Sequence, residues 1–277
     1  MIPEDIRTEI LRRLQNAEAE HGVRILFAIE SGSRAWGFAS PNSDYDVRFV
    51  YIREPEWYQA VDLEERRDVI EYPIVDDIDL NGWDVRKALR LFWKSNPAFV
   101  EWIQSPIAYI DQSLFREAAL ALLPEIYSPE KGIYHYRSMA KTNYRGYLRE
   151  PVVRLKKYFY VLRPLLAARW IAKTGSAAPI EFEKLLSLLQ EEPAVLSEVH
   201  TLLEQKRGAP ELGLAPAVPP INAFIEAELE GGSVEIPQKS RDPRVVNQLN
   251  ELFHRVLEEY RANGSSKPTP FRGAGLA

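Results

Sequence analysis

Apolar residues near the start of the chain repeat at helical spacing, at Ile6, Ile10, Leu14 and Ala17. The spacing predicts a helix over residues 4–20, with Pro3 in its first turn and Gly22 at its end. The pattern then changes to that of strands, because short apolar or alternating runs replace the helical repeat. Strands are predicted at 23–30, 44–52, 68–75 and 77–83.

The pattern changes again at Asp84, which is a good N-cap for a helix that stops at Asn96-Pro97. Beyond that point helical spacing dominates, and a proline at position 164 is expected to kink or break one helix. A proline-rich loop is expected at 208–221. The further helices are predicted at 113–127, 134–150, 152–175, 180–192 and 243–264.

Strands in the first part of the chain and helices in the second predict an α+β protein. We expect a small mixed β-sheet domain over residues 1–105 and an all-helical domain over 106–262. Residues 263–277 are rich in Gly, Ser and Pro and are expected to form a flexible tail. The cleft between two such lobes is a usual place for a ligand.

Composition narrows the classes of function. The 277 residues carry a net charge of −5, which argues against coating of nucleic acid by bulk charge but leaves a local basic groove open. The absence of cysteine excludes thiolate metal sites and fits a cytoplasmic location. The first residues do not resemble a signal peptide, and no apolar run approaches the roughly 20 residues that cross a bilayer, so no membrane contact is expected.

The most informative stretch is SGSRAWGFASPNSDYDVRFVYI, residues 31–52. Gly32 permits a sharp turn and a close approach of a ligand to the main chain, and Ser33 adds a hydroxyl donor beside it. Asp44 and Asp46 are two residues apart on a predicted strand, so their carboxylates share a face. Two carboxylates on one face suit a hard cation such as Mg²⁺, which also binds substrate phosphates.

A phosphoryl or nucleotidyl transfer site would need a third carboxylate, for a second metal ion or to deprotonate the attacking hydroxyl. The segment DDIDLNGWD supplies Asp76, Asp77, Asp79 and Asp84. Asp79 is preferred because Ile78 and Leu80 flank it within the predicted strand, whereas Asp84 is better explained as the helix cap. Asp77 would share a strand face with Asp79 and stays open.

The pattern Gly32-Ser33, then Asp44-x-Asp46, then a later strand carboxylate resembles the signature of the DNA polymerase beta-like nucleotidyltransferase superfamily. Over residues 28–106 the sequence resembles the RlaP branch of this superfamily, which consists of predicted nucleotidyltransferases associated with RNA repair. The resemblance implies two Mg²⁺ ions and transfer of a nucleoside monophosphate from a nucleoside triphosphate to a hydroxyl, with ATP among the substrates. By position, Gly32 and Ser33 contact the triphosphate, Asp44 and Asp46 bind metal, and Asp79 is the third catalytic and metal-binding carboxylate.

Two basic side chains are further candidates for nucleotide binding. Arg34 lies inside the motif loop, where it either contacts phosphate or braces the loop against an acidic neighbour. Lys157 is a candidate by resemblance, because in related two-lobe enzymes a lysine of the helical lobe reaches the phosphates.

A basic stripe at four-residue steps consists of Arg137, Lys141, Arg145 and Arg149. It is either a solvated helix face or a surface for a triphosphate or an RNA backbone. Aromatic side chains that could stack a base accompany it: Tyr134, Tyr136, Tyr144 and Tyr158. The tryptophans Trp83, Trp93 and Trp102 are expected in the core, and the four histidines have no metal-ligand spacing.

The acceptor stays open at this point. An RNA end, a small molecule of the aminoglycoside type and a protein side chain are alternatives, as is a non-catalytic nucleotide-binding partner of the antitoxin type. The sequence does not indicate the base preference or the oligomeric state.

Overall fold

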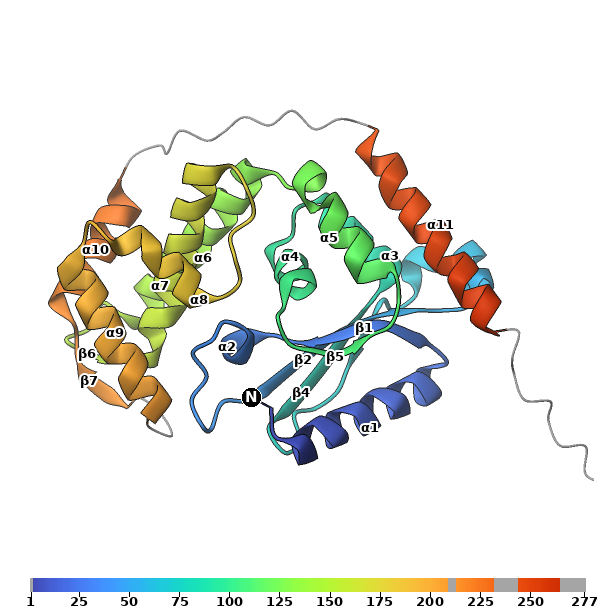
Figure 1. The fold of residues 1–277 in the computed structure, drawn as a ribbon, viewed down its shortest axis with the longest axis horizontal. Coiled ribbons are helices and arrows are strands. Elements are labelled where there is room, and N and C mark those ends of the chain that lie inside the picture. The colour runs from blue at the N-terminus through green and yellow to red at the C-terminus, as the bar shows by residue number, and fades with distance from the viewer. Residues whose placement is uncertain (1, 209–212, 232–243, 265–277) are drawn as a thin grey trace, which may run out of the picture.

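The computed structural model describes residues 2–208, 213–231 and 244–264. Its first part holds five strands and the helices that cover them (Figure 1). The strands are β1 (Arg24–Glu30), β2 (Tyr45–Ile52), β3 (Val69–Glu71), β4 (Ile78–Asp84) and β5 (Ala108–Asp111). The helices of this part are α1 (Glu4–His21), α2 (Gly32–Ala35), α3 (Val85–Trp93), α4 (Pro97–Gln104) and α5 (Phe115–Ile126), with short 3-10 turns at Pro55–Gln59 and Leu63–Glu65.

The five strands form one mixed sheet in the order β3-β4-β2-β1-β5. The pair β2 and β4 is parallel, and the other neighbours are antiparallel. Parallel pairing needs a crossover, which the long connection from residue 53 to residue 77 provides. This pairing matters for function because both strands begin at the same edge of the sheet.

Each face of the sheet buries its own apolar cluster. On one face, Ile10 and Leu14 of α1 pack against strand residues such as Val47 and Leu80. On the other face, α3, α4 and α5 cover the sheet, and their cluster continues into the helices beyond. Figure 1 shows α1 below the sheet and α3, α4 and α5 above it. Apolar burial on both faces is what fixes the register of the strands.

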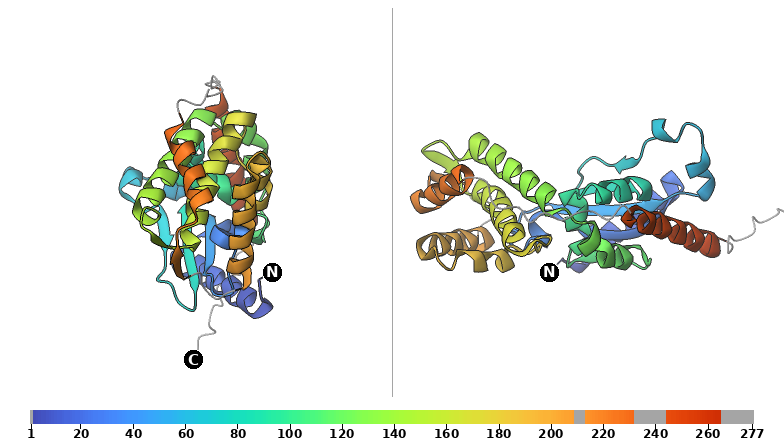
Figure 2. Two further views of the ribbon diagram at one scale, coloured as in Figure 1. Left: turned by 90° about the vertical axis from the view of Figure 1, so that its left-hand side faces the viewer. Right: turned by 90° about the horizontal axis from the view of Figure 1, so that it is seen from above.

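The second part of the chain is helical, apart from a two-stranded ladder of β6 (Val152–Arg154) and β7 (Leu214–Pro216). Its helices lie beside one end of the sheet (Figures 1 and 2). They are α6 (Pro129–Tyr147), α7 (Lys156–Thr174), α8 (Phe182–Leu185), α9 (Pro193–Gly208) and α10 (Pro219–Glu230), with a 3-10 turn at Leu186–Leu189. The last helix, α11 (Val245–Gly264), packs instead against α3 and α5.

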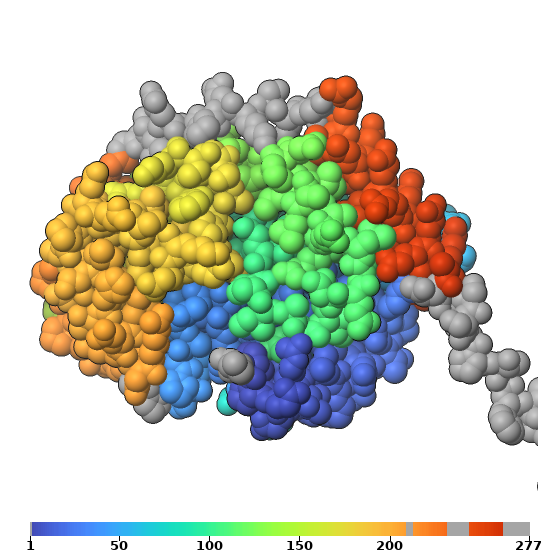
Figure 3. All heavy atoms as spheres, in the orientation of Figure 1, coloured from blue at the N-terminus to red at the C-terminus, as the bar shows by residue number. Residues whose placement is uncertain are grey.

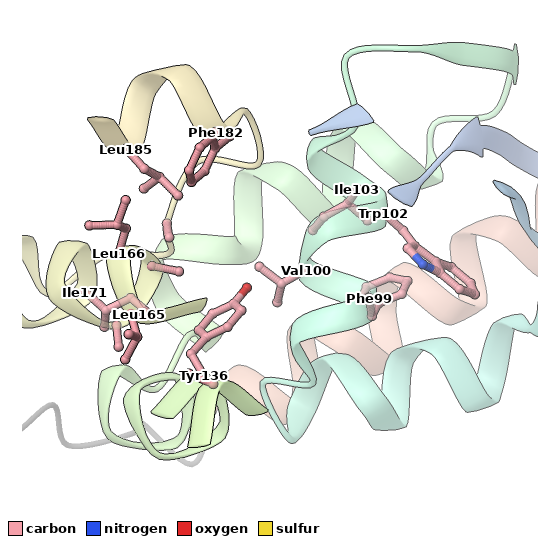
Figure 4. Close-up of a cluster of buried hydrophobic side chains, with 14 of the residues drawn as sticks. Phe99, Val100, Trp102, Ile103, Tyr136, Leu165, Leu166, Ile171, Phe182 and Leu185 are labelled. Atoms are coloured by element: carbon pink, nitrogen blue, oxygen red, sulfur yellow. The ribbon is translucent and has the colours of Figure 1, made fainter. Parts of the chain in front are cut away.

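Buried side chains join the two parts. Phe99 and Trp102 of α4 belong to the same cluster as Tyr136 of α6 and Leu166 of α7, and Val100 lies between these groups (Figure 4). The helical part also lies against the segment after α2 (Figure 3). There Phe182 N donates a hydrogen bond to Trp36 O at 2.9 Å. The two parts therefore share a continuous apolar contact.

The α+β fold class is confirmed, and the predicted strands and helices are present with several differences. The strand expected at 68–75 is shorter, and the helix expected from residue 152 begins at Lys156, after β6. Pro164 lies inside α7, which continues through it. Four elements were not predicted, namely α4, β5, α9 and α10, and β7 occupies part of the expected loop at 208–221. The expected tail lies, from residue 265 onward, outside the described residues.

The domain boundary predicted at residue 105 stays a prediction. Strand β5 comes directly after it in sequence and pairs with β1, so the sheet takes a strand from beyond residue 105.

Candidate active site

Asp46 and Asp79 lie side by side at the start of the two parallel strands. They are register partners in the ladder between β2 and β4, so both carboxylates project from the same face. The side chains are 29% and 27% exposed, which leaves both within reach of solvent. Burial raises the pKa of Asp46 above its ordinary value, and the nearby carboxylates of Asp79 and Asp44 raise it further while Arg48 lowers it.

The guanidinium group of Arg48 lies between these two carboxylates. Its Nη2 is 3.1 Å from Oδ1 of Asp46 and 2.7 Å from Oδ2 of Asp79, and its Nη1 donates to the carbonyl oxygens of Val47 and Asp79. Charge-assisted hydrogen bonds of this kind are stronger than neutral ones. The position between the carboxylates is thus already one where a cation is held.

Gly32 packs directly against Asp46. A Cβ atom at position 32 would be 1.9 Å from Oδ2 of Asp46, and the backbone φ of Gly32 is +58°, a region that side chains disfavour. Ser33 follows in the single turn of α2 and is buried. The structure therefore brings the predicted glycine-serine turn into contact with the predicted metal-binding carboxylate.

Asp44 and Arg34 occupy the rim of the site. Asp44 is exposed in the last position before β2, and its carbonyl oxygen accepts a hydrogen bond from Nε of Arg34 at 3.2 Å. Arg34 also donates to the carbonyl of Ser43 and lies over the ring of Tyr45 at 3.9 Å. Arg34 thus holds the motif loop through backbone carbonyl oxygens, whereas the predicted brace was against an acidic side chain, and its contact with nucleotide stays a prediction.

Glu30, for which no role was predicted, holds the backbone of Asp46 through a hydrogen bond. Its Oε1 accepts a hydrogen bond from the backbone N of Asp46 at 3.0 Å, and its Oε2 accepts one from the hydroxyl of Tyr109 at 2.5 Å. Burial raises the pKa of Glu30 to about 7. A glutamate directly after the five apolar residues 25–29 of β1 is the signal that would have indicated this role.

Lys157 lies in the first turn of α7, beside two tyrosine rings. Its Nζ is 4.0 Å from the ring centre of Tyr147 and 5.1 Å from that of Tyr160, one turn further along the helix. The pKa of Tyr160 is raised by burial and then by the charges of Asp46 and Asp44, so this tyrosine is close to the site. The structure thus places Lys157 beside Tyr160, and its contact with phosphate stays a prediction.

The other candidates for the third carboxylate lie at the two ends of β4, with Asp76 and Asp77 before its first residue and Asp84 as its last. Asp84 caps α3 by accepting a hydrogen bond from Arg86 N at 2.8 Å, as expected, and it is buried. Asp76 and Asp77 form a turn before β4 with φ values of 52° and 59°, so Asp77 does not share a strand face with Asp79.

The basic stripe faces a different part of the molecule. Lys141, Arg145 and Arg149 line a cavity of about 430 Å³ together with acidic residues of α10, and Arg137 donates to the carbonyls of Leu229 and Gly231. Three of the tyrosines proposed for base stacking are buried instead: Tyr136, Tyr144 and Tyr158. Trp102 is buried as expected, whereas Trp83 and Trp93 are half-buried.

Within residues 2–208, 213–231 and 244–264, no group of three or more His, Asp or Glu side chains is arranged to hold a metal ion. Of the three carboxylates predicted to bind metal, Asp46 and Asp79 thus lie side by side, whereas Asp44 lies at the rim of the site. In the same part of the chain no helix combines the length and the apolarity that a bilayer crossing requires.

A mixed sheet with helices behind it, and two carboxylates beside a glycine turn, are features of the nucleotidyltransferase-like class. Residues 6–255 match the family model "RlaP: RNA repair pathway DNA polymerase beta family", and the chain belongs to this family. It is 44% identical over 264 residues to the uncharacterized protein YcgL of Bacillus subtilis (strain 168), covering 94% of this chain and all of that protein.

A crystal structure of a nucleotidyltransferase-like protein from Exiguobacterium sibiricum also matches, at 10% identity and over 95% of each chain. The TM-score of 0.29 is too low for any inference from that likeness. Membership of a DNA polymerase beta family is what indicates a nucleotidyltransferase-like function.

Proposed function

We propose that the chain is a Mg²⁺-dependent nucleotidyltransferase that moves a nucleoside monophosphate from a nucleoside triphosphate to a hydroxyl group at an RNA end. The observation that carries the proposal is the pairing of Asp46 with Asp79 on parallel strands, with Gly32 packed against Asp46. The association of the family with an RNA repair pathway favours RNA as the acceptor.

The residues at the site fit a magnesium ion. A guanidinium already bridges Asp46 and Asp79, so the space between them suits positive charge, and carboxylate oxygens are the ligands that Mg²⁺ prefers. Asp46 and Asp79 would hold the ion, and Asp44 at the rim would supply a further oxygen. Bound there, Mg²⁺ would neutralise charge on the triphosphate and so favour displacement at its α-phosphorus.

The chain's own residues position the reactants. The acceptor oxygen attacks the α-phosphorus, the bond from that phosphorus to the oxygen bridging to the β-phosphate breaks, and pyrophosphate leaves. A carboxylate oxygen of Asp79 receives the proton of the attacking hydroxyl. Gly32 and Ser33 present the turn of α2 to the triphosphate, and Lys157 approaches it from α7.

The test is transfer of label from each of the four α-³²P nucleoside triphosphates to RNA in the presence of Mg²⁺. Asp46→Asn and Asp79→Asn should each reduce transfer by at least about 100-fold, because a metal ligand or base contributes on that order. Asp62→Asn, at an exposed pair remote from the site, is the matched control and should keep full activity. Activity retained in both site variants would exclude the proposed site.

A further inference from the structure

We propose that a cavity beside the carboxylate pair binds the base of the nucleotide and favours bases that carry an exocyclic amino group, with Asn81 as the selecting residue. The inference rests on the proposed function, because it assigns the base of the same nucleotide whose phosphates lie at Asp46 and Asp79. It adds a preference among nucleotides, which the family membership does not supply.

The cavity has a volume of about 610 Å³ and lies between the sheet, α4, α6 and α7. This volume is within the range of small-molecule sites, about 300–1,000 Å³. Three of the residues that line the cavity connect it to the carboxylates. Arg48, which bonds both carboxylates, lines it, and so do Ser31 and Trp36, which flank the turn containing Gly32 and Ser33. A nucleotide with its phosphates at this turn therefore has its base within reach of the cavity.

The wall of the cavity offers flat aromatic surfaces. Trp83 and Trp102 stack with their ring centres 3.8 Å apart. Trp102 is only 4% exposed while Trp83 is half-buried, so the open surface of this pair belongs to Trp83. Tyr160 of α7 also lines the cavity and is 36% exposed. Open aromatic rings of this kind are the surfaces on which nucleic acid bases stack.

Asn81 supplies the polar contact that discriminates between bases. It lies two residues after Asp79 and two before Trp83, on the same face of β4. Its Nδ2 donates a hydrogen bond to Oε1 of Glu71 at 3.2 Å. The opposite orientation of the amide would set its oxygen against the carboxylate of Glu71, so the side chain's acceptor points away from Glu71.

That acceptor, Oδ1 of Asn81, is buried and has no hydrogen-bond partner among the residues that the structure describes. Buried polar atoms in proteins are almost always paired, and an unpaired one is costly. Asn81 lines a cavity that already offers rings for stacking. A small rotation of its side chain would bring the unpaired oxygen to an amino group of a ligand bound there and so satisfy it. The exocyclic amino groups of adenine, cytosine and guanine provide such a donor, whereas uracil has no amino group and its ring N–H lies between two carbonyl oxygens that an acceptor repels.

The decisive comparison uses two ligands that differ by one group. ATP and purine riboside triphosphate share the ring, the ribose and the phosphates, but the second has hydrogen in place of the amino group. Calorimetric titration of the full chain with Mg²⁺ should give about tenfold tighter binding for ATP, the amount expected for one satisfied buried acceptor. Equal affinity of the wild-type protein for the two ligands would overturn the proposal without need of any variant.

Variants identify the residue responsible. Asn81→Leu should reduce the tenfold preference for ATP to less than about twofold, whereas Asn143→Leu, at an asparagine of α6 bonded to Met139 O, should leave it unchanged. Trp83→Ala should weaken binding of both ligands about tenfold, since stacking does not depend on the amino group. A preference that survives in Asn81→Leu would assign the selection elsewhere and reject the role of Asn81.

Failure of this inference can be told apart from failure of the proposed function. Selective binding of ATP without transfer to any acceptor would support the base site and reject the transferase. Transfer to RNA with no preference for ATP over purine riboside triphosphate would support the transferase and reject the base site. Absence of nucleotide binding would reject both.

Discussion

Asp46 and Asp79 face each other across parallel strands β2 and β4, and the chain supplies its own cation between them. Arg48 comes from β2, two residues after Asp46, so one strand provides both a carboxylate and its counter-ion. Two carboxylates and one guanidinium leave a net charge of −1 at this point. The pair is therefore stabilised in the free chain and still attracts a positively charged ligand.

The first prediction concerns that counter-ion. Arg48→Met leaves two part-buried carboxylates together without a cation, which should lower the free energy of unfolding by about 2 kcal/mol, less than for a fully buried pair. Mg²⁺ should restore more of the melting temperature in this variant than in the wild type, because it then has no guanidinium to displace. The measurement is thermal unfolding in EDTA and in Mg²⁺.

Arg66→Met is the matched control for this prediction, since Arg66 pairs with Asp62 in an exposed i,i+4 contact away from the site. Its stability should change by less than about 1 kcal/mol, and Mg²⁺ should have the same effect on it as on the wild type. An equal response of the Arg48 and Arg66 variants to Mg²⁺ would show that the carboxylate pair does not bind the ion.

The second prediction concerns the contact between Gly32 and Asp46. In Gly32→Ala the new Cβ would lie 1.9 Å from Oδ2 of Asp46, so the carboxylate or the turn must move. Displacement of a catalytic group by about 1 Å costs on the order of 100-fold in rate. Transfer should fall by that amount, and stability by about 2 kcal/mol, because alanine also disfavours the left-handed backbone.

Gly37→Ala separates the two effects. Gly37 has a φ of +86°, but a Cβ there would meet nothing within 4 Å. This variant should lose about 1 kcal/mol of stability and keep its activity, because only the backbone is strained. If both glycine variants lose activity equally, the contact with Asp46 is not the reason why position 32 is glycine.

The third prediction concerns the buried ion pair between the two parts of the chain. Glu101 of α4 accepts hydrogen bonds from Arg163 of α7 at 2.9 Å, from Tyr136 of α6 at 2.8 Å and from Trp36 at 3.1 Å. Arg163→Met would leave a buried carboxylate without its counter-ion, and the free energy of unfolding should fall by about 3–5 kcal/mol. Urea denaturation monitored by circular dichroism provides the measurement.

Two further variants test this explanation. Glu101→Gln combined with Arg163→Met should recover much of the loss, since neither charge then stays buried. Arg169→Met, at another arginine of α7, breaks a partly exposed contact with Glu192 and Glu228 and should cost only about 1 kcal/mol. Equal losses for Arg163 and Arg169 would mean that burial of the pair is not decisive.

The carboxylate pair could be predicted from the sequence because each member lies in a recognisable strand. Asp79 is flanked by Ile78 and Leu80, which pack into the core, and strand alternation then places its side chain on the opposite face. The role of Arg48 could not be predicted, because its contact with Asp79 depends on the register of two strands that are distant in sequence. The burial of Glu30 likewise depends on Tyr109 of β5, a strand that spacing alone did not reveal.

The predictions made for the helical part were weaker for a related reason. Helical spacing indicates which residues share a face, but not which element covers that face. Tyr136 precedes the basic stripe in sequence and Tyr158 follows it, yet both hydroxyls donate hydrogen bonds inside the protein, Tyr136 to Glu101 and Tyr158 to Asn222. The stripe itself faces α10, whose position depends on long-range packing.

The last prediction concerns pH and uses Asp84, the buried cap of α3. Burial raises its pKa to about 6, although hydrogen bonds from Tyr58 and from the backbone of Arg86 act in the opposite direction. The folded state then binds the proton more tightly than the unfolded state, whose carboxyl has a pKa near 3.8. The resulting stabilisation is fully present below about pH 4 and is lost as the pH rises through about 6.

Asp84→Asn removes this titration but keeps an oxygen that can accept from Arg86 N. The free energy of unfolding of the wild type, relative to this variant, should therefore fall by up to about 3 kcal/mol between pH 4 and pH 7. Denaturant titrations of both proteins across that range measure the difference. Asp62→Asn is the control: the pKa of this exposed carboxyl is lowered by its hydrogen bond with Arg66, so its effect should have the opposite sign. A difference for Asp84→Asn that is flat or rises with pH would show that the carboxyl is ionised in the fold at little cost.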